Sequence, residues 1–215
     1  MMTGLVRKAT LFALGGLFVA GAAMANVPDP LQSTCPYPHI YIVGNDGTSP
    51  DRGNGQFTVT VIGLNGLPIE NSVVVVDFAA CIDIALCPDQ LQPGVLTTAT
   101  SVRQLTNVAG QAVFTVIGKG KPGVGCGSST KTCVNIYADG VYLCSVGAGI
   151  YDLVNSAPSG VGSEDLAEWI SLWLCGTMPT RADYIPDWTV DSSDLSKWIT
   201  VWLAGNSSIG CTPKF

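Results

Sequence analysis

The sequence predicts a mainly β protein, an antiparallel β-sandwich followed by a small pair of C-terminal helices. From Cys35 to Tyr151 the apolar residues alternate with a period of two, which is typical of half-buried strands. After this region, a segment of about sixteen residues occurs twice, at 161–176 and again at 190–205. Each copy carries apolar residues at the spacing of an amphipathic helix.

Residues 1–25 predict a secretory signal. Arg7 and Lys8 form a basic start, an apolar stretch follows, and residues 23–25 (Ala-Met-Ala) give the small-x-small pattern of a cleavage site. The mature chain is then expected to begin near Asn26 and to be secreted, either free or at the cell surface. Since no later stretch is long enough to cross a bilayer, we do not expect a transmembrane protein once the signal is removed.

The composition argues against two classes of partner. The chain has a formal net charge of −6, and only 12% of its residues are charged. An acidic chain with ten Lys and Arg lacks the basic surface that binding to nucleic acid or to an anionic membrane requires. We therefore expect neither partner.

Eight cysteines follow the signal, and an even count in an exported chain predicts disulfides. A zinc site is disfavoured, because the chain has no C-x2-C motif and no pair of histidines. The pairing cannot be derived from the sequence alone. We favour Cys175 with Cys211, which would tie the end of one repeated helix to the tail after the other, and Cys81 with Cys87 across a short loop.

The strand region contains about seven short segments rich in β-branched residues, separated by Gly, Pro and Asn turns, which favours an antiparallel sandwich. The Asp139-Gly140 dipeptide between two strand patterns is the strongest hairpin signal in the chain. In order, the expected strands are residues 40–43, 56–63, 72–78, 97–105, 111–117, 133–138 and 141–148.

Two phrases in this region resemble bacterial immunoglobulin-like domains of the invasin and intimin kind. The first, GQFTVTVIGLNGLPIENSVVVVDF, spans residues 55–78, and the second, TNVAGQAVFTV, begins at Thr106. The second has a physical basis, because Gly110 supplies a positive φ before Phe114 points inward. The resemblance implies that residues 26–151 form an Ig-like β-sandwich that displays loops or contacts other surface proteins.

Each copy of the repeat predicts one helix. Ser163 and Ser192 lie where N-caps belong, and Gly176 and Gly205 lie where helices end. The two apolar stripes, with two tryptophans each, are expected to be buried against each other or against a partner. The first stripe is Leu166, Trp169, Ile170, Trp173 and Leu174, and the second is Leu195, Trp198, Ile199, Trp202 and Leu203.

A loop with calcium-ligand spacing leads into the second helix. Asp183, Asp187, Asp191 and Asp194 occupy positions 1, 5, 9 and 12 of a twelve-residue window, and Thr189 at position 7 would contribute its carbonyl. This is the spacing of the EF-hand, and it predicts Ca²⁺ as a cofactor of the loop. Alternatively, these aspartates are helix-start charges and turn formers on a solvated loop.

Both copies depart from the EF-hand pattern. In the second loop, Ile185 replaces the oxygen ligand of position 3, and Trp188 stands at position 6, where the sharp turn favours glycine. In the first copy, counting back eleven residues from Asp165 reaches Val154, whose side chain cannot bind a metal ion. We therefore expect calcium at the second loop only.

The duplicated loop and helix, with V-D-x-x-D-L at the second junction, resemble a type I dockerin domain. The resemblance implies that residues 152–215 form a docking module, ordered by calcium, whose partner is a cohesin-like or other surface protein. Alternatively, the helices are a structural cap. The contact surface that the resemblance implies consists of Glu164, Ala167, Glu168 and Ser171 in the first helix and Ser193, Ser196, Lys197 and Thr200 in the second.

No catalytic constellation is apparent, so we do not expect an enzyme. His39 is the single histidine, and no G-x-S-x-G motif accompanies it. The leading hypothesis is an exported, non-enzymatic binding or scaffold protein. The alternative is an extracellular carbohydrate-binding sandwich capped by the helices, with a polysaccharide as its partner, which requires exposed aromatic side chains. Its candidates are Tyr37, Tyr41, Tyr137, Tyr142 and Tyr151, whose orientation the sequence leaves open.

Overall fold

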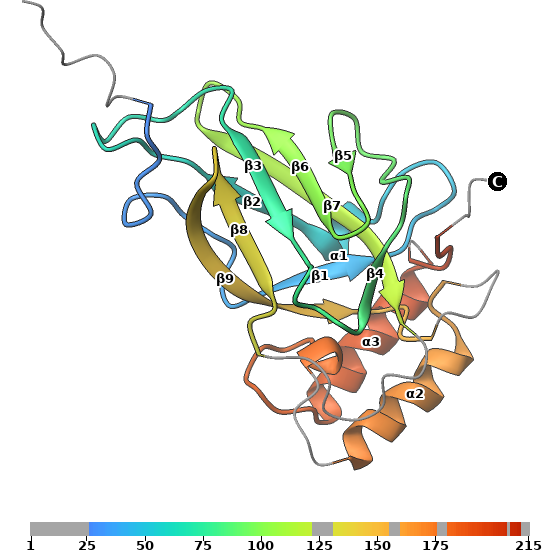
Figure 1. Cartoon of the computed structure of the whole chain (residues 1–215). Helices are drawn as coiled ribbons and strands as arrows, with labels where there is room; N and C mark the ends of the chain where they lie inside the picture. The colour runs from blue at the N-terminus through green and yellow to red at the C-terminus, as the bar shows by residue number, and fades with distance from the viewer. Residues whose placement is uncertain (1–25, 122–130, 155–159, 176–179, 206, 212–215) are drawn as a thin grey trace, which may run out of the picture.

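A mixed β-sheet of nine strands organises the protein, and two C-terminal helices pack against one end of it (Figure 1). The computed structural model describes residues 26–121, 131–154, 160–175, 180–205 and 207–211. The predicted signal, residues 1–25, lies outside the described residues.

The nine strands pair mostly in antiparallel fashion. They are β1 (His39–Val43), β2 (Gln56–Thr60), β3 (Val73–Asp77), β4 (Ile84–Leu86), β5 (Leu96–Thr97), β6 (Ser101–Leu105), β7 (Gln111–Gly120), β8 (Val134–Ala138) and β9 (Val141–Ile150). Their order across the sheet is β2-β7-β1-β9-β8-β3-β6-β5, and β4 pairs with β7. β1 runs parallel to both of its neighbours, β7 and β9, whereas the other ladders are antiparallel.

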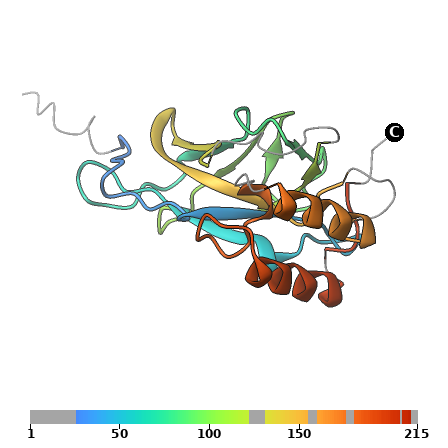
Figure 2. The same cartoon turned by 90° about the horizontal axis from the view of Figure 1, so that it is seen from below.

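The sheet is continuous and curls into a half-barrel, so the predicted two-sheet sandwich of the immunoglobulin-like type is wrong (Figures 1 and 2). The cause is β1, in which Ile42 pairs with Val116 of β7 on one side and with Ile150 of β9 on the other. This strand joins two groups of strands that a sandwich would keep in separate layers. Because an alternating strand buries one face in either arrangement, the period of two could not distinguish them.

The predicted hairpin is confirmed. Asp139 and Gly140 join β8 to β9, and both have positive φ angles, 48° and 81°. The turn predicted before β7 is also present, because Gly110 has a φ of 71°. A Cβ atom at Gly110 would lie 2.5 Å from the carbonyl oxygen of Val61, so a larger residue would not fit there. These local signals therefore located the turns correctly.

The hydrophobic core fills the concave side of the sheet and continues beneath the helices. Phe57 of β2 and Phe114 of β7 are directly opposite each other, with ring centroids 5.5 Å apart. The same cluster of buried side chains includes Trp169 and Trp198 from the helices. The sheet and the helices therefore bury their apolar side chains together, which is the dominant favourable contribution to folding.

The two predicted helices are present. The helical segments are α1 (Arg52–Gly55), α2 (Ser163–Leu174), the 3-10 turn η1 (Thr180–Ala182) and α3 (Ser192–Ala204). The N-caps of α2 and α3 are Gly162 and Asp191, one residue before the predicted serines. Gly205 ends α3 with a φ of 73°, as predicted, whereas Gly176 lies outside the described residues.

Hydrogen bonds fasten the helical region to the end of the sheet where β1 and β9 lie (Figure 2). Tyr184 donates its hydroxyl to the carbonyl oxygen of Ile150 at 2.7 Å, and its ring stacks on that of Tyr151 with centroids 4.8 Å apart. Trp198 donates Nε1–H to the carbonyl oxygen of Tyr151 at 3.1 Å. Tyr41 donates its hydroxyl to the carbonyl oxygen of Tyr184 at 3.0 Å. These bonds fix the loop before α3 relative to the sheet.

Disulfides join distant parts of the chain. Among the described residues they are Cys35–Cys144, Cys81–Cys133 and Cys87–Cys211. Both predicted pairings, Cys175 with Cys211 and Cys81 with Cys87, are therefore wrong, although Cys175 is itself disulfide-bonded. The predictions relied on closeness in the sequence, whereas the fold brings Cys81 and Cys133 to a Cα–Cα distance of 4.9 Å from 52 residues apart.

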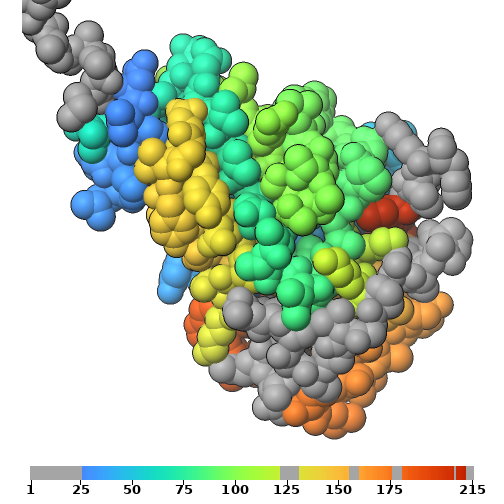
Figure 3. All heavy atoms as spheres, in the orientation of Figure 1, coloured from blue at the N-terminus to red at the C-terminus, as the bar shows by residue number. Residues whose placement is uncertain are grey.

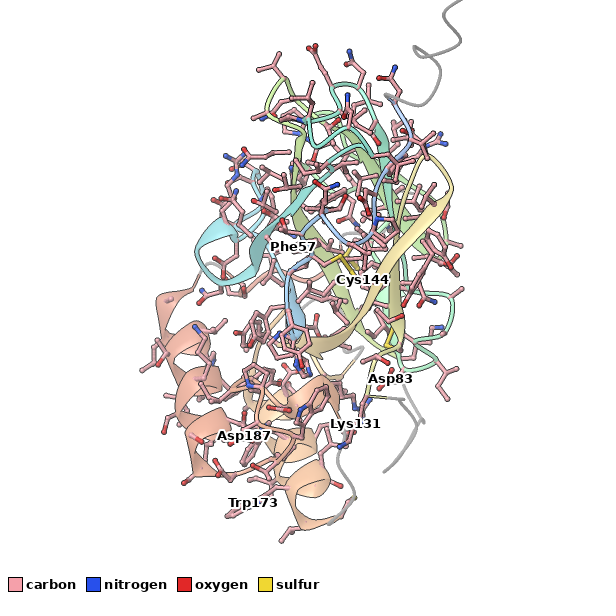
Figure 4. The ribbon with its side chains drawn as sticks, turned by 90° about the vertical axis from the view of Figure 1, so that its left-hand side faces the viewer. Phe57, Asp83, Lys131, Cys144, Trp173 and Asp187 are labelled. Atoms are coloured by element: carbon pink, nitrogen blue, oxygen red, sulfur yellow. A yellow bond between two sulfur atoms is a disulfide. The ribbon has the colours of Figure 1, made fainter. Side chains whose placement is uncertain are left out.

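These disulfides are typical of an extracellular protein and agree with the predicted export. Figure 4 shows Cys144 in the sheet, well away from the helices. In the part of the chain that the structure describes, no helix has the length and apolar character needed to span a membrane.

Candidate functional site

A buried carboxylate organises the loop that precedes α3. Asp194, in the first turn of this helix, is 1% exposed. Its Oδ1 accepts hydrogen bonds from the backbone N–H groups of Tyr184 and Ile185 at 2.6 and 2.7 Å, and its Oδ2 accepts from Asp191 N at 2.8 Å. The side chain therefore caps the helix and closes the loop with the same three bonds.

The start of α2 repeats this arrangement. Asp165 is also buried, and its Oδ1 accepts from Val154 N at 2.8 Å while its Oδ2 accepts from Gly162 N at 2.7 Å. The backbone of Leu153 donates to the same carboxylate. The duplication seen in the helices therefore extends to the segments upstream of them.

Each of these segments begins with a second buried aspartate. Asp183 precedes Tyr184 and is 2% exposed, and Asp152 precedes Leu153 and is 1% exposed. In both side chains Oδ1 has no hydrogen-bond partner among the described residues. Asp152 is thus the structural counterpart of Asp183, and counting back by a fixed loop length missed it because the first loop is two residues longer.

Burial and mutual repulsion raise the pKa values of these carboxyl groups. Burial, together with the charge of Asp194, raises the pKa of Asp183 to about 7. Burial and the charge of Asp165 raise the pKa of Asp152 to about 8, although Lys119 opposes this shift. Burial also raises the pKa values of Asp165 and Asp194 above their usual range, against the effect of their backbone donors. A cation beside either pair would favour the ionised forms.

Trp188 makes the sharp turn of the second loop. Its φ angle is 71°, which is the left-handed conformation that position 6 of such a loop requires and that glycine usually supplies. Its backbone N–H donates to Asp183 Oδ2 at 3.0 Å. The ring lies between His39, at 5.0 Å between centroids, and Lys131, whose Nζ is 5.0 Å from the ring centroid. The turn that the sequence put in doubt is therefore formed, and contacts with β1 and with the segment before β8 hold it.

The other predicted ligands have local partners. Asp187 is exposed, and its Oδ1 accepts from Thr189 N at 2.9 Å. Asp191 Oδ1 accepts from Ser193 N at 2.7 Å, and the hydrogen bonds from Ser193 lower its pKa. Within the described segments, no three His, Cys, Asp or Glu side chains come close enough together to hold a metal ion. The turn of the loop and the position of Asp183 thus fit a Ca²⁺ site, whereas Asp187 and Asp191 direct their Oδ1 atoms to local backbone N–H groups instead.

The predicted docking residues are mostly accessible. Two of them make contacts within the protein. Glu168 forms an ion pair with the buried Arg181 at 2.6 Å, and Lys197 Nζ donates to Asn54 Oδ1 at 3.4 Å. The exposed members are Glu164, Ala167, Ser171, Ser193, Ser196 and Thr200.

Within the chain itself, the two helix stripes are buried only in part, and burial of the rest against a partner stays a prediction. Trp169 and Trp198 are fully buried, as expected, but the next residues toward the core are Leu172 and Val201. The C-terminal half of each stripe faces solvent instead, because each helix is rotated about its axis relative to the predicted face. We call these exposed residues the paired apolar strips; they are Ile170, Trp173 and Leu174 on α2 and Ile199, Trp202 and Leu203 on α3.

The single histidine and the tyrosines lie in different surroundings. His39 is buried with no hydrogen-bond partner for either nitrogen among the described residues, and burial lowers its pKa to about 4. Tyr151 is fully buried, and Tyr41 is partly buried. Tyr37 and Tyr142 are exposed, by 84% and 49%. The tyrosines therefore do not form one common surface.

No protein-family model, curated protein or solved structure matches the chain. Its function is therefore inferred from the residues and contacts described above.

Proposed function

We propose that this is an exported, non-enzymatic binding protein whose helical pair docks onto a protein partner. The observation that carries the proposal is the pair of apolar strips. Trp173 is 47% exposed and Trp202 is 38% exposed, at the same position of the two helices. Contiguous apolar side chains of this kind on a protein surface mark interaction sites.

The exposed tryptophans are held in place before any partner binds. The Trp173 ring lies 5.6 Å from that of the buried Trp169, and the Trp202 ring lies 5.3 Å from that of the buried Trp198. Since each exposed ring rests on a fixed one, docking costs little side-chain entropy. Tryptophans in such positions are frequent binding hot spots. Figure 4 shows Trp173 on the helical pair, at the end of the molecule away from the sheet.

Calcium at the second loop is part of the proposal. Asp183 would be the principal ligand, because its Oδ1 has no partner among the described residues and the charge of Asp194 acts on its carboxyl group. Thr189 would contribute its carbonyl oxygen. Asp187 and Asp191 would have to exchange their present hydrogen bonds for the ion. When bound, Ca²⁺ supplies positive charge that offsets the repulsion within the carboxyl pair and orders the loop in front of α3.

Calorimetric titration of the oxidised, signal-free protein with Ca²⁺ tests the calcium site, together with thermal melts in Ca²⁺ and in excess EDTA. We expect measurable heat and a higher melting temperature in Ca²⁺, both of which Asp183→Asn should abolish. Glu70→Gln, which alters an exposed carboxylate in the turn before β3, is the control and should behave as the wild type. No heat and no shift at millimolar Ca²⁺ would remove the metal from the proposal and leave the docking surface standing.

The docking surface is tested with a variant that makes both strips polar, Leu174→Glu combined with Leu203→Glu. Both leucines are more than three-quarters exposed, at 77% and 78%, so the folded structure should be unaffected. Proteins exported by the source cells are passed over immobilised wild type and variant. We expect the wild type to retain a partner that the double variant loses and that Val108→Glu, an equally exposed control at 77% in the turn between β6 and β7, still retains. Equal retention by the double variant would contradict the docking surface.

A further inference from the structure

A row of side chains crosses the outward face of the sheet, with one residue from each of the strands β5, β6, β3, β8 and β9. Val75 of β3 pairs with Arg103 of β6 on one side and with Tyr137 of β8 on the other, and Tyr137 pairs with Tyr142 of β9. Residues paired in this way have neighbouring side chains on the same face, about 4.5–5.5 Å apart. Leu96 of β5 pairs with Arg103 and extends the row. Figure 3 shows β8, β3 and β6 side by side on this face of the molecule.

A polar row runs beside it. It lies two residues further along β3, β6 and β8, and three residues further along β9, where the β8–β9 ladder has a register shift. In this row Asp77 pairs with Ser101 and with Asn135, and Asn135 pairs with Ser145. Ser145 Oγ donates to Asn135 Oδ1 at 2.6 Å and is within 2.8 Å of the Tyr142 hydroxyl. The face therefore places an apolar and aromatic row about 7 Å from a parallel row of hydrogen-bonding groups, since each residue of a strand advances about 3.3 Å.

The apolar row ends in a cavity. Its volume is about 240 Å³, and it is lined by Val73, Gly94, Leu96, Arg103, Gln104 and Leu105. Val73, Leu96 and Leu105 give it a largely apolar lining and Arg103 supplies hydrogen-bond donors, so it suits a ligand that has both apolar and hydroxyl groups.

We propose that this outward face binds a neutral polysaccharide chain laid across the strands. Sugar rings have apolar C–H faces, which suit the leucines, Val75 and the tyrosine rings, and hydroxyl rims, which suit the polar row. Arg103 and Asp77 bring one charge of each sign, so the face has no excess charge that would select an ionic ligand. This binding surface is separate from the paired apolar strips and does not depend on them.

The arrangement of the two tyrosines limits how the polysaccharide binds. The rings of Tyr137 and Tyr142 are 5.8 Å apart and inclined by 69°, so they meet edge to face and do not form a flat platform. Tyr137 is half-buried, whereas Tyr142 is 49% exposed. The exposed Tyr142 therefore offers one stacking position for one sugar ring, and the cavity at the far end of the row accommodates a second part of the chain.

Affinity electrophoresis tests the proposal, with hydroxyethylcellulose, xylan, laminarin and pullulan as probes in the gel. We expect at least one of these neutral polysaccharides to retard the wild type. Tyr142→Ala should weaken binding about tenfold, as the loss of one stacked ring implies. Arg103→Ala should weaken it as well. Tyr37→Ala is the matched control, because Tyr37 is a more exposed tyrosine outside both rows.

Two results would overturn the proposal. One is migration of the wild type unchanged by all four polysaccharides. The other is equal weakening by Tyr37→Ala and Tyr142→Ala, which would show that any exposed tyrosine suffices. The strip variant Leu174→Glu/Leu203→Glu should bind the polysaccharide as the wild type does, so a failure of the docking proposal is distinguishable from a failure of this one.

Discussion

At the scale of single residues, two carboxyl groups are placed where their charge is costly. Asp152 and Asp183 are buried, each beside a second aspartate, and each retains one oxygen without a partner among the described residues. A buried carboxylate without compensation holds its proton to higher pH than usual. Protons and cations therefore compete for both sites, and neutral pH lies within the range where that competition decides the charge of the loops.

The stability of the metal-free protein should fall as the pH rises from about 4 to about 8. Asp152 has a pKa of about 8 in the folded state, against an ordinary value of 3.8, so over this range the folded state binds more protons than the unfolded state. Asp152→Asn should therefore have a higher melting temperature than the wild type at pH 8, by about 2–4 °C for each kcal/mol gained in the free energy of unfolding. At pH 4 the two melting temperatures should be nearly equal. Thermal melts in EDTA at several pH values across this range, with Glu70→Gln as control, measure this pH dependence. Parallel curves for Asp152→Asn and wild type would refute it.

The backbone of Trp188 is strained, whereas its side chain makes stabilising contacts. Its left-handed backbone costs a non-glycine residue about 1–2 kcal/mol, which the contacts with His39 and Lys131 offset. Trp188→Ala should lower the free energy of unfolding by about 1–3 kcal/mol, because it loses the ring and keeps the strain. Trp188→Gly should be more stable than Trp188→Ala by about 1 kcal/mol. Urea denaturation measures both, and a glycine variant less stable than the alanine variant would contradict the strained turn.

At the scale of elements, each helix has two apolar faces with different tasks. In α2, Leu172 is buried against the core, whereas Leu174, two residues on, is 77% exposed. The same division separates Val201 from Leu203 in α3. Each helix therefore buries one set of apolar side chains against the sheet and exposes a second set near its C-terminal end.

Glutamate substitutions distinguish these faces. Leu172→Glu buries a charge without a partner and should cost several kcal/mol, enough to disrupt docking of α2 onto the sheet. Leu174→Glu should change the free energy of unfolding by no more than about 0.5 kcal/mol. Thermal melts of both variants measure the difference. Similar destabilisation by the two would mean that Leu174 is covered by the protein itself and that the strip is not a free surface.

At the scale of the whole molecule, the tail after α3 returns to the sheet. Asn45 pairs with Ile209 in an isolated bridge, Ser207 Oγ donates to Asp51 Oδ2 at 2.6 Å, and Cys211 is bonded to Cys87. The tail thus connects the loop after β1 with the segment after β4. It fastens the helical region to the sheet through contacts that are separate from those of Tyr184.

Removing the disulfide of the tail should destabilise the whole molecule. Cys87 and Cys211 are 124 residues apart, and a bond that closes so long a loop restricts the unfolded chain strongly. Cys87→Ala combined with Cys211→Ala should lower the free energy of unfolding by about 2–5 kcal/mol. Urea denaturation measures this effect, after non-reducing peptide mapping has verified the pairing in the wild type. An unchanged midpoint would show that the tail is held without the bond.

Local features of the fold could be predicted from the sequence, and non-local ones could not. The Asp139-Gly140 hairpin and the ends of the helices depend on neighbouring residues, so turn and helix signals located them. The position of β1 between β7 and β9 depends on pairing across most of the chain, which periodicity does not encode. The predicted disulfide pairings were wrong for the same reason, because the fold brings together cysteines that are distant in the sequence.

The candidate site could likewise be predicted from the sequence only in part. The spacing of Asp183 and Asp194 was visible in the sequence, and both are buried in the same loop. Asp152 was missed because the first loop is longer, and only the repeated hydrogen bonds to Asp165 reveal the equivalence. The accessible half of each helix stripe was also invisible, because the spacing of apolar residues does not say which of them the sheet covers.

The central place of β1 has a consequence for the kinetics of folding. This strand is the first of the sheet in the chain, yet both of its partners, β7 and β9, are synthesised much later. Until β1 is inserted, β7 and β9 each keep an unpaired edge, which is the kind of edge that promotes association between chains. Closing such long loops is slow, so the sheet is completed late. A chain whose sheet can be completed only after β9, which ends at Ile150 of 215 residues, cannot finish folding early in synthesis, and this delay is consistent with the predicted export.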